Sequence, residues 1–111
     1  MHIRKEQPGD VAAIRRLTDE AFRGVPYSNQ KEAAIINALR LASALTLSMV
    51  AEEEGSLLGH VAFSPVLIDG TDCNWYGLGP VSVQPGRQGE GIARTLIREG
   101  LLRLQEAGAK G

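Results

Sequence analysis

Residues 81–97 read VSVQPGRQGEGIARTLI and join an alternating apolar strand to an amphipathic helix. The connecting loop holds Gly86, Gly89 and Gly91, although glycine weakens a helix start that Ser, Thr or Asp would strengthen. Either the loop needs unusual backbone angles, or a bound group must come close to bare backbone amides. Amides at a helix start, with the helix dipole behind them, form an anion site suited to phosphate. The loop is therefore the first candidate for a binding site.

The bulk composition is that of a small globular protein. The chain has 111 residues, of which 43% are hydrophobic and 23% charged, and its net charge is -1. These values predict one domain, and they show no excess of positive charge that would favour binding to nucleic acid or to an anionic membrane. The sole cysteine, Cys73, excludes an internal disulfide and a cysteine metal cluster. Because the N-terminus is polar and no apolar run could span a bilayer, we expect a cytoplasmic protein, and we expect no metal site.

The first part of the chain predicts a strand and two helices. Residues 2–6 can form a short strand, after which Pro8 and Asp10 favour a helix start. Asn29, with Glu32 three residues later, is typical of a capping box for the second helix. Apolar residues recur at helical spacing at Val11, Ile14, Leu17, Ala21 and Phe22, and then at Ile35, Ile36 and Leu39.

From about residue 45 the spacing of apolar residues changes to the period of two that is typical of β-strands. Apolar side chains alternate with polar ones from Leu45 to Ala51, which predicts a strand. Residues 56–68 form the returning strand of a hairpin, and residues 73–84 follow the turn signal Asp69-Gly70. Pro80 lies inside this last strand and lacks a donor for the ladder. We therefore expect a β-bulge at Pro80 that opens a slot along the strand.

The last predicted helix has a wide apolar face, and Leu102 adds an apolar residue on its opposite side. This face comprises Ile92, Leu96, Ile97, Leu101 and Leu104. The strand at residues 73–84 would be a long sheet edge that is poor in charge, and natural proteins normally pair or cover such edges. We therefore expect either self-association or a longer protein that supplies the missing cover.

Two phosphate-binding patterns do not fit the glycine loop. A P-loop carries G-K-[ST] at its helix start, whereas this loop has Gly91-Ile92-Ala93 there, with no lysine. A dinucleotide fingerprint read from Gly89 would place Arg94 where the third small residue belongs, and the chain lacks the βαβ unit that the fingerprint requires.

A third pattern fits: the run QGEGIA at residues 88–93 matches Q-x-x-G-x-[GA] after the strand VSV and Pro85. This run resembles the acetyl-CoA-binding motif of the GCN5-related N-acetyltransferase (GNAT) family, and the order of elements is similar over the whole chain. The stretch GLGPVSVQPGRQGEGIARTLI looks most like bacterial acetyltransferases of undefined substrate. The resemblance implies a mixed α/β acyl-CoA N-acyltransferase fold in the order β-α-α-β-β-β-α. Residues 1–111 would form a single, incomplete domain without the family's C-terminal β-α-β-β part.

The resemblance also implies where the cofactor acetyl-CoA binds. Backbone amides of the glycine loop would hold the pyrophosphate, and the pantetheine arm would run beside strand residues 81–83. The backbone N–H of Val81 would donate to the oxyanion of the tetrahedral intermediate. Pyrophosphate and 3′-phosphate would attract Arg87 or Arg94. The residues assigned to the cofactor are Val81, Ser82, Val83, Gln88, Gly89, Glu90, Gly91, Ile92, Ala93 and Arg94.

The general base is not assigned by the sequence. Glu52, Glu53 and Glu54 are candidates, although a carboxylate cluster beside a turn is typically solvated. His60 and Ser64 share one face of a strand, and His60 is either a base or relay, or a structural histidine.

The acceptor contacts are equally open. Cys73 is expected to pack as a small hydrophobe, and Trp75 and Tyr76 either line an acceptor pocket or belong to ordinary packing. The resemblance makes Tyr27 a candidate acceptor contact, because the loop that holds it borders the acceptor site in the family. The family's usual general acid, a tyrosine in a later helix, has no counterpart in residues 1–111.

The function that follows is transfer of an acetyl group from acetyl-CoA to a primary amine of a small molecule or a protein. Two alternatives stay open at this point. The chain is a catalytically silent acyl-CoA-binding or regulatory module, or it is a structural interaction domain whose glycine loop binds nothing.

Overall fold

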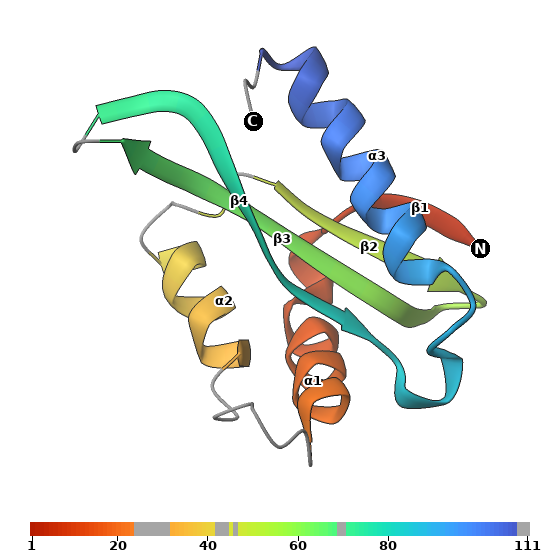
Figure 1. The fold of residues 1–111 in the computed structure, drawn as a ribbon. Coiled ribbons are helices and arrows are strands. Elements are labelled where there is room, and N and C mark those ends of the chain that lie inside the picture. The colour runs from red at the N-terminus through yellow and green to blue at the C-terminus, as the bar shows by residue number, and fades with distance from the viewer. Residues whose placement is uncertain (24–31, 42–44, 46, 69–70, 109–111) are drawn as a thin grey trace.

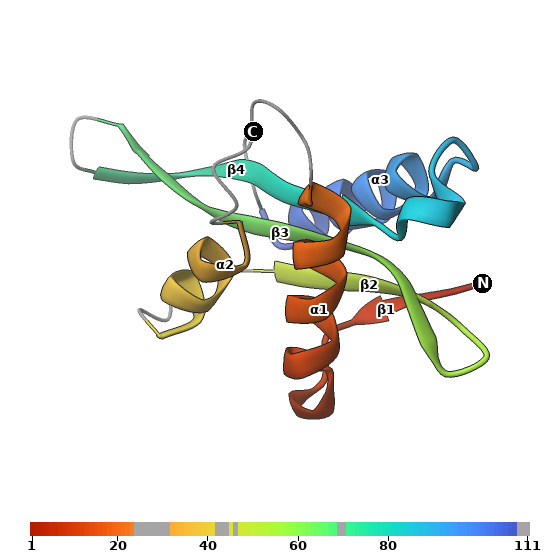
Figure 2. The same cartoon turned by 90° about the horizontal axis from the view of Figure 1, so that it is seen from below.

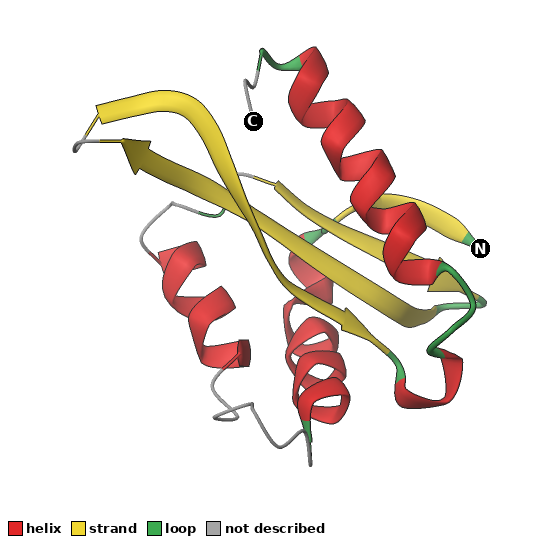
Figure 3. Cartoon of the chain, in the orientation of Figure 1, coloured by secondary structure: helices red, strands yellow, loops and turns green. Residues whose placement is uncertain are grey.

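The computed structural model describes residues 1–23, 32–41, 45, 47–68 and 71–108, with the backbone alone at residues 33, 66–68 and 71–75. Figure 1 shows the fold, and Figure 3 shows the helices and strands in separate colours. The elements are β1 (His2–Lys5), α1 (Val11–Phe22), α2 (Glu32–Leu41), β2 (Leu47–Glu53), β3 (Ser56–Ile68), β4 (Thr71–Val83) and α3 (Ile92–Glu106), with short 3-10 helices η1 (Pro8–Asp10) and η2 (Pro85–Arg87). None of the described helices is long and apolar enough to cross a membrane.

The four strands form one antiparallel sheet in the order β1-β2-β3-β4. The register places Val50 of β2 opposite His60 of β3, and His60 opposite Ser82 of β4. In this sheet β4 is an edge strand, as the sequence predicts. The meander of three strands and the mixed α/β class are both confirmed.

Helices cover both faces of the sheet. Figures 1 and 2 show α1 and α2 on one face and α3 on the other. The core on the α3 face contains Leu47, Met49, Ala51, Leu58, Val61, Phe63, Ile92, Leu96 and Leu104. A smaller cluster on the α1 and α2 face contains Ile14, Ile36 and Val50. Because β2 is covered on both faces, it is buried from Leu47 to Ala51 in spite of its alternating sequence.

Several strand boundaries differ from the predicted ones, and β1 and β4 each end one residue earlier than expected, at Lys5 and Val83. Leu45 lies before β2 and packs with the cluster on the α1 and α2 face, whereas Leu47 packs on the α3 face. The prediction that Leu45 continues the same strand alternation is therefore wrong. β4 begins at Thr71, two residues earlier than expected, and β3 occupies residues 56–68 as predicted. The turn at Asp69-Gly70 and the cap at Asn29 lie outside the described residues.

The expected bulge is present in β4. The pairing register shifts between Val61 and Phe63 of β3, which pair with Val81 and Leu78 of β4. One β3 residue therefore faces two on β4, namely Gly79 and Pro80, and Gly79 has a φ of 131° that favours glycine. The bulge directly precedes residues 81–83, to which the sequence assigns the pantetheine arm.

The buried face of α3 differs from the expected one. Its buried residues are Ile92, Leu96, Gly100 and Leu104, a stripe with a spacing of four, whereas Leu101 is 51% exposed. The prediction that Leu101 lies on the packed face is wrong. Gly100 takes its place because Phe63 of β3 lies directly against it and leaves no room for a side chain.

Candidate active site

A hollow of about 620 Å³ lies where α1 ends, β4 ends and α3 begins. Its lining comes from three segments that are far apart in the sequence, and the glycine loop contributes most of it. The lining residues are Ala21, Phe22, Val81, Val83, Arg87, Gln88, Gly89, Gly91, Ile92, Ala93 and Arg94. The structure therefore brings together most of the residues that the sequence assigns to the cofactor.

The glycine loop leaves the start of α3 open. Gly89 and Gly91 have φ values of 85° and 82°, in the left-handed region that glycine adopts without strain. Gly91 is the N-cap of α3 and makes no side-chain capping bond, and the first helical hydrogen bond runs from Thr95 N to Gly91 O at 3.0 Å. The amides of Ile92, Ala93 and Arg94 are thus left without partners inside the helix. The first proposed reason for the glycines, unusual backbone angles, therefore applies at Gly89 and Gly91. The second, the approach of a bound group to bare amides, stays a prediction.

The end of β4 forms the second wall of the hollow. Val81 and Val83 line it, whereas the side chain of Ser82 points to the opposite face and is fully buried. The Ser82 hydroxyl donates a long hydrogen bond of 3.4 Å to Thr18 Oγ1 of α1. Since no described strand pairs with the outer edge of β4, outward-facing backbone groups of this segment remain available to a ligand.

Glu90 does not line the hollow, and its carboxylate pairs with Arg87, which does. The Arg87 Nε lies 2.9 Å from Glu90 Oε1, and its Nη2 lies 3.4 Å from Glu53 Oε2 at the end of β2. Glu90, and to a smaller extent Glu53, raise the pKa of the Arg87 guanidinium. Arg87 thus sits at the rim in a carboxylate pair that the sequence did not predict.

The carboxylates that end β2 do not line the hollow. Glu52 pairs with Arg4 at 3.3 Å, and Arg4 also binds Asp10 at 2.7 Å. The hydrogen bonds from Arg4 lower the pKa of Asp10 below its ordinary value. Glu53 holds Arg87, and Glu54 is exposed in the turn before β3, with a φ of 51°. No candidate base is therefore found in this cluster at the hollow.

His60 is fully buried beneath α1 and does not face the hollow. Its Nε2 lies 2.7 Å from Ser48 Oγ, and its Nδ1 has no hydrogen-bond partner among the described residues. Burial disfavours the charged imidazolium and lowers the pKa of His60 to about 4. His60 is therefore neutral near pH 7, while Ser64 lies four residues further along β3 and is half-buried.

The remaining candidates fall outside the hollow or outside the described residues. Tyr76 is half-buried and packs against the α3-face core. Tyr27 and the side chains of Cys73 and Trp75 lie outside the described part of the chain. Among the described residues, no three His, Cys, Asp or Glu side chains gather in a way that could hold a metal ion.

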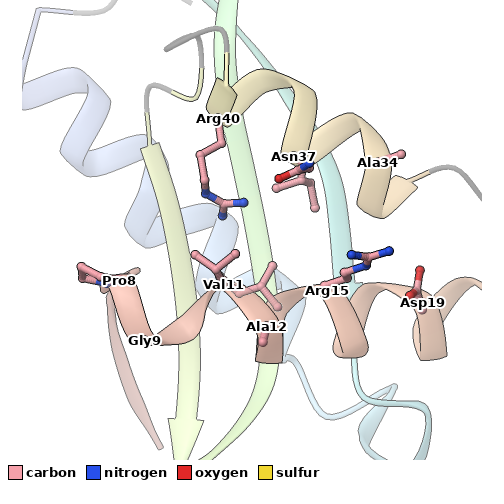
Figure 4. A pocket seen from close by; sticks show the side chains of 11 residues that line it. Pro8, Gly9, Val11, Ala12, Arg15, Asp19, Ala34, Asn37 and Arg40 are labelled. Atoms are coloured by element: carbon pink, nitrogen blue, oxygen red, sulfur yellow. The ribbon is translucent and has the colours of Figure 1, made fainter.

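Sequence reasoning missed a second cavity of about 610 Å³ between α1 and α2. Figure 4 shows Arg40 of α2 reaching toward Val11 of α1, with Asn37, Arg15 and Asp19 further along the cavity. Arg40 already binds the carboxylate of Glu6, with Nη2 at 2.8 Å. The polar residues come from two helices whose mutual packing the sequence pattern does not specify, so no sequence signal could have found this cavity.

Comparison with known proteins identifies the fold. The model of the acetyltransferase (GNAT) domain matches residues 2–110. The chain is 40% identical over 109 residues to the uncharacterized N-acetyltransferase YhbS of Escherichia coli strain K12, covering 97% of this chain and 62% of YhbS. It thus spans less than two thirds of the length of this curated relative.

Two solved structures are similar over nearly the whole chain. A GNAT family acetyltransferase from Brucella melitensis, in complex with acetyl-CoA, has a TM-score of 0.98 and 67% identity over 99% of this chain and 71% of that one. Escherichia coli YhbS in complex with CoA has a TM-score of 0.88 and 38% identity over 97% of this chain and 58% of that one. The family match and these folds confirm the resemblance carried by the glycine loop. The chain belongs to the GNAT acetyltransferase family.

Proposed function

We propose that this protein is an N-acetyltransferase that binds acetyl-CoA in the hollow beside β4 and transfers its acetyl group to a primary amine. The observation that carries the proposal is the open start of α3, with its free amides, next to the unpaired edge of β4. Two similar proteins have been solved with acetyl-CoA or CoA bound, which supports the same cofactor here.

The residues around the hollow suit this cofactor. The amides from Gln88 to Arg94 can accept a pyrophosphate without obstruction, because Gly89 and Gly91 carry no Cβ. Val81 and Val83 provide an apolar wall for a pantetheine arm, and the backbone N–H of Val81 is the proposed oxyanion donor. When bound, acetyl-CoA supplies an activated thioester carbonyl for attack by the amine. The acceptor remains a primary amine of a small molecule or a protein.

A catalytically silent acyl-CoA-binding module is the second candidate. It is favoured by one observation: no described carboxylate or imidazole side chain lines the hollow. Two measurements distinguish the transferase from the silent module: binding of coenzyme A, and release of its thiol from acetyl-CoA in the presence of amines.

The test of the binding site is Gly91→Val, which places a branched side chain over the first amides of α3. We expect coenzyme A binding, measured by calorimetry, to weaken more than tenfold, or about 1.4 kcal/mol. Gly86→Ala in the same loop is the matched control, because its Cβ would meet nothing within 4 Å and its φ is ordinary. Asparagine tolerates the left-handed φ better than valine does, so Gly91→Asn adds a side chain over the amides while the loop keeps its conformation. This variant therefore distinguishes a blocked site from a distorted loop. Unchanged affinity in both Gly91 variants would remove the site from this loop.

The test of the activity is release of free thiol from acetyl-CoA with kanamycin, spermidine, L-lysine or an alanine-initiated peptide as acceptor. Turnover with any one of them supports the transferase. Tight coenzyme A binding without turnover in the whole panel would favour the silent module.

A further inference from the structure

The cavity of about 610 Å³ between α1 and α2, here called the α1–α2 cavity, shares no lining residue with the hollow beside β4. Its apolar lining includes Ile14 and Ile36, which are both fully buried. Both helices also contribute polar side chains to it, namely Arg15, Asp19, Asn37 and Arg40. An apolar surface with a few convergent polar groups is the usual form of a small-molecule site.

Arg40 is held in place by Glu6, which does not line the cavity. Its Nε lies 3.2 Å from Glu6 Oε2, and its Nη2 lies 2.8 Å from Glu6 Oε1. The Arg40 side chain is 25% exposed, and Nη1 makes no hydrogen bond within the described part of the chain. A guanidinium carries more N–H donors than these two contacts use. Arg40 therefore presents fixed, charged donors that suit a carboxylate.

Arg15 and Asp19 are the charged residues that α1 contributes to the cavity. They lie one helical turn apart, a spacing that places their Cβ atoms about 5–6 Å from each other. Neither side chain makes a hydrogen bond or an ion pair with any other described residue. A ligand head that carries a carboxylate and an ammonium on one carbon offers a partner to each of them. This head is that of an α-amino acid.

Arg40 lies at a different level of the cavity from this pair. In Figure 4 it reaches toward Val11 at the start of α1, whereas Arg15 and Asp19 lie further along the helix. Val11 and Arg15 are four residues apart, which corresponds to about 6 Å along the axis of α1. Val11 and Ala12 provide apolar surface over this distance. A ligand that contacts all three charged residues therefore carries a second anionic group on a short alkyl chain.

We propose that the α1–α2 cavity binds a dicarboxylic amino acid of the size of L-glutamate. Arg15 receives its α-carboxylate, Asp19 its ammonium, and Arg40 its distal carboxylate. The single net negative charge of this ligand complements a lining that contains Arg15 and Arg40 against Asp19. The site is separate from the cofactor hollow, so this proposal goes beyond the proposed function and does not depend on it.

The position of the site is tested by an NMR titration of the protein with L-glutamate at low salt and without coenzyme A. Low salt limits the screening of the exposed charges. We expect saturable shifts of the backbone amides at residues 11–19 and 34–40. The absence of saturable shifts, or shifts centred on the glycine loop, would overturn the proposal. Because no coenzyme A is present, a failure of the proposed function leaves this result intact.

The charged ends of the ligand are tested with two analogues of L-glutamate. Glutarate lacks the ammonium, and L-norvaline lacks the distal carboxylate. We expect each to bind about tenfold more weakly than L-glutamate, because each loses a charge-assisted hydrogen bond. Asp19→Asn should remove the preference for L-glutamate over glutarate, and Arg40→Gln the preference over L-norvaline. Equal binding of the three compounds by the parent would contradict the proposal.

Matched controls for these variants lie next to them on α1. Arg16 and Glu20 have the same spacing as Arg15 and Asp19 and line neither the α1–α2 cavity nor the hollow. Arg16→Gln and Glu20→Gln should therefore keep both preferences. Variants of Arg15 and Asp19 that bind L-glutamate as these controls do would contradict the assignment of the head group.

Arg40→Gln also breaks the ion pair with Glu6, so a second variant covers the case in which it does not fold. Arg15→Gln leaves that pair intact and should weaken L-glutamate binding about tenfold. Thermal unfolding followed by circular dichroism shows that each variant is folded. A folded Arg15→Gln protein with the affinity of the parent would overturn the role of Arg15.

Discussion

Glu90 and Arg87 form an ion pair at the rim of the hollow. The Arg87 side chain is 33% exposed and that of Glu90 is 46% exposed, so solvent and salt screen the pair. Arg94, by contrast, is exposed and makes no ion pair within the described part of the chain. A phosphate that enters the loop therefore competes with Glu90 for Arg87 but meets Arg94 unopposed.

We expect Glu90→Gln to tighten coenzyme A binding about two- to fivefold at low salt, because it frees Arg87 and removes a negative charge from the rim. The gain should shrink as salt rises. Calorimetry at two ionic strengths measures it, with Glu106→Gln at the far end of α3 as a control of equal charge. Weaker binding in Glu90→Gln would show that the pair holds Arg87 in its binding position.

His60 gives the fold a pH dependence with a definite sign. Its pKa is about 4 in the folded protein and ordinarily 6.5, so between these values the unfolded chain binds a proton that the folded chain does not. Stability is complete above pH 6.5 and falls as the pH decreases toward 4, by up to about 1.4 kcal/mol per pH unit.

Urea unfolding between pH 6.5 and pH 5 measures this slope in a window where histidine is the main titrating side chain. His2→Ala should keep the slope, because His2 is exposed on β1, whereas His60→Gln should lose it. A flat profile in the parent would mean that His60 is protonated in the folded state.

At the scale of elements, α3 packs against β3 at Gly100, which lies directly against the Phe63 ring. A Cβ on Gly100 would lie 2.6 Å from Cζ of Phe63, which is buried in the core. Strand positions were predictable because period-two alternation fixes which face each residue occupies. The face of α3 was not, because Gly100 counts as a helix-weakening residue in sequence and only Phe63 on β3 makes it an interface residue.

We therefore expect Gly100→Ala to destabilise the protein although alanine is the better helix former. Overpacking costs about 1–3 kcal/mol, against a gain of about 1 kcal/mol in helix propensity. Thermal or urea unfolding measures the difference. Gly9→Ala is the control, since its Cβ would meet nothing within 4 Å. A Gly100→Ala protein as stable as the parent would show that Phe63 can move aside.

At the scale of the whole molecule, the glycine loop predicted more about the fold and the candidate site than the composition did. Glycine is needed where the backbone adopts an unusual angle or where a group must come close to the backbone. Both are local requirements, so one short stretch of sequence is enough to indicate them. The contact between Arg87 and Glu53 joins residues 34 positions apart, and the hydrogen bond between Ser82 and Thr18 joins residues 64 positions apart. Such pairings depend on register and helix placement, which no local pattern encodes.

The outer edge of β4 is the longer of the two edges of the described sheet, and no described strand pairs with it. Leu78 on this strand is 45% exposed, and Leu101 and Leu102 form a second exposed apolar area on α3. Edges of this kind pair with other chains unless a charge blocks them. We expect the 111-residue chain to self-associate at low micromolar concentration, through the edge and not through α3.

Sedimentation velocity tests this with two lysine substitutions. Leu78→Lys should shift the chain toward monomer, because a charge on the edge opposes strand pairing. Leu101→Lys, of equal size and charge on the helix, should leave association unchanged. The reverse pattern would assign the contact to α3, and a monomeric parent would show that the β4 edge is tolerated in water as it stands.

An edge that pairs with a second copy would also occupy the backbone proposed to bind pantetheine. Saturating coenzyme A should then dissociate the dimer, and association that coenzyme A does not change would place the contact away from residues 81–83.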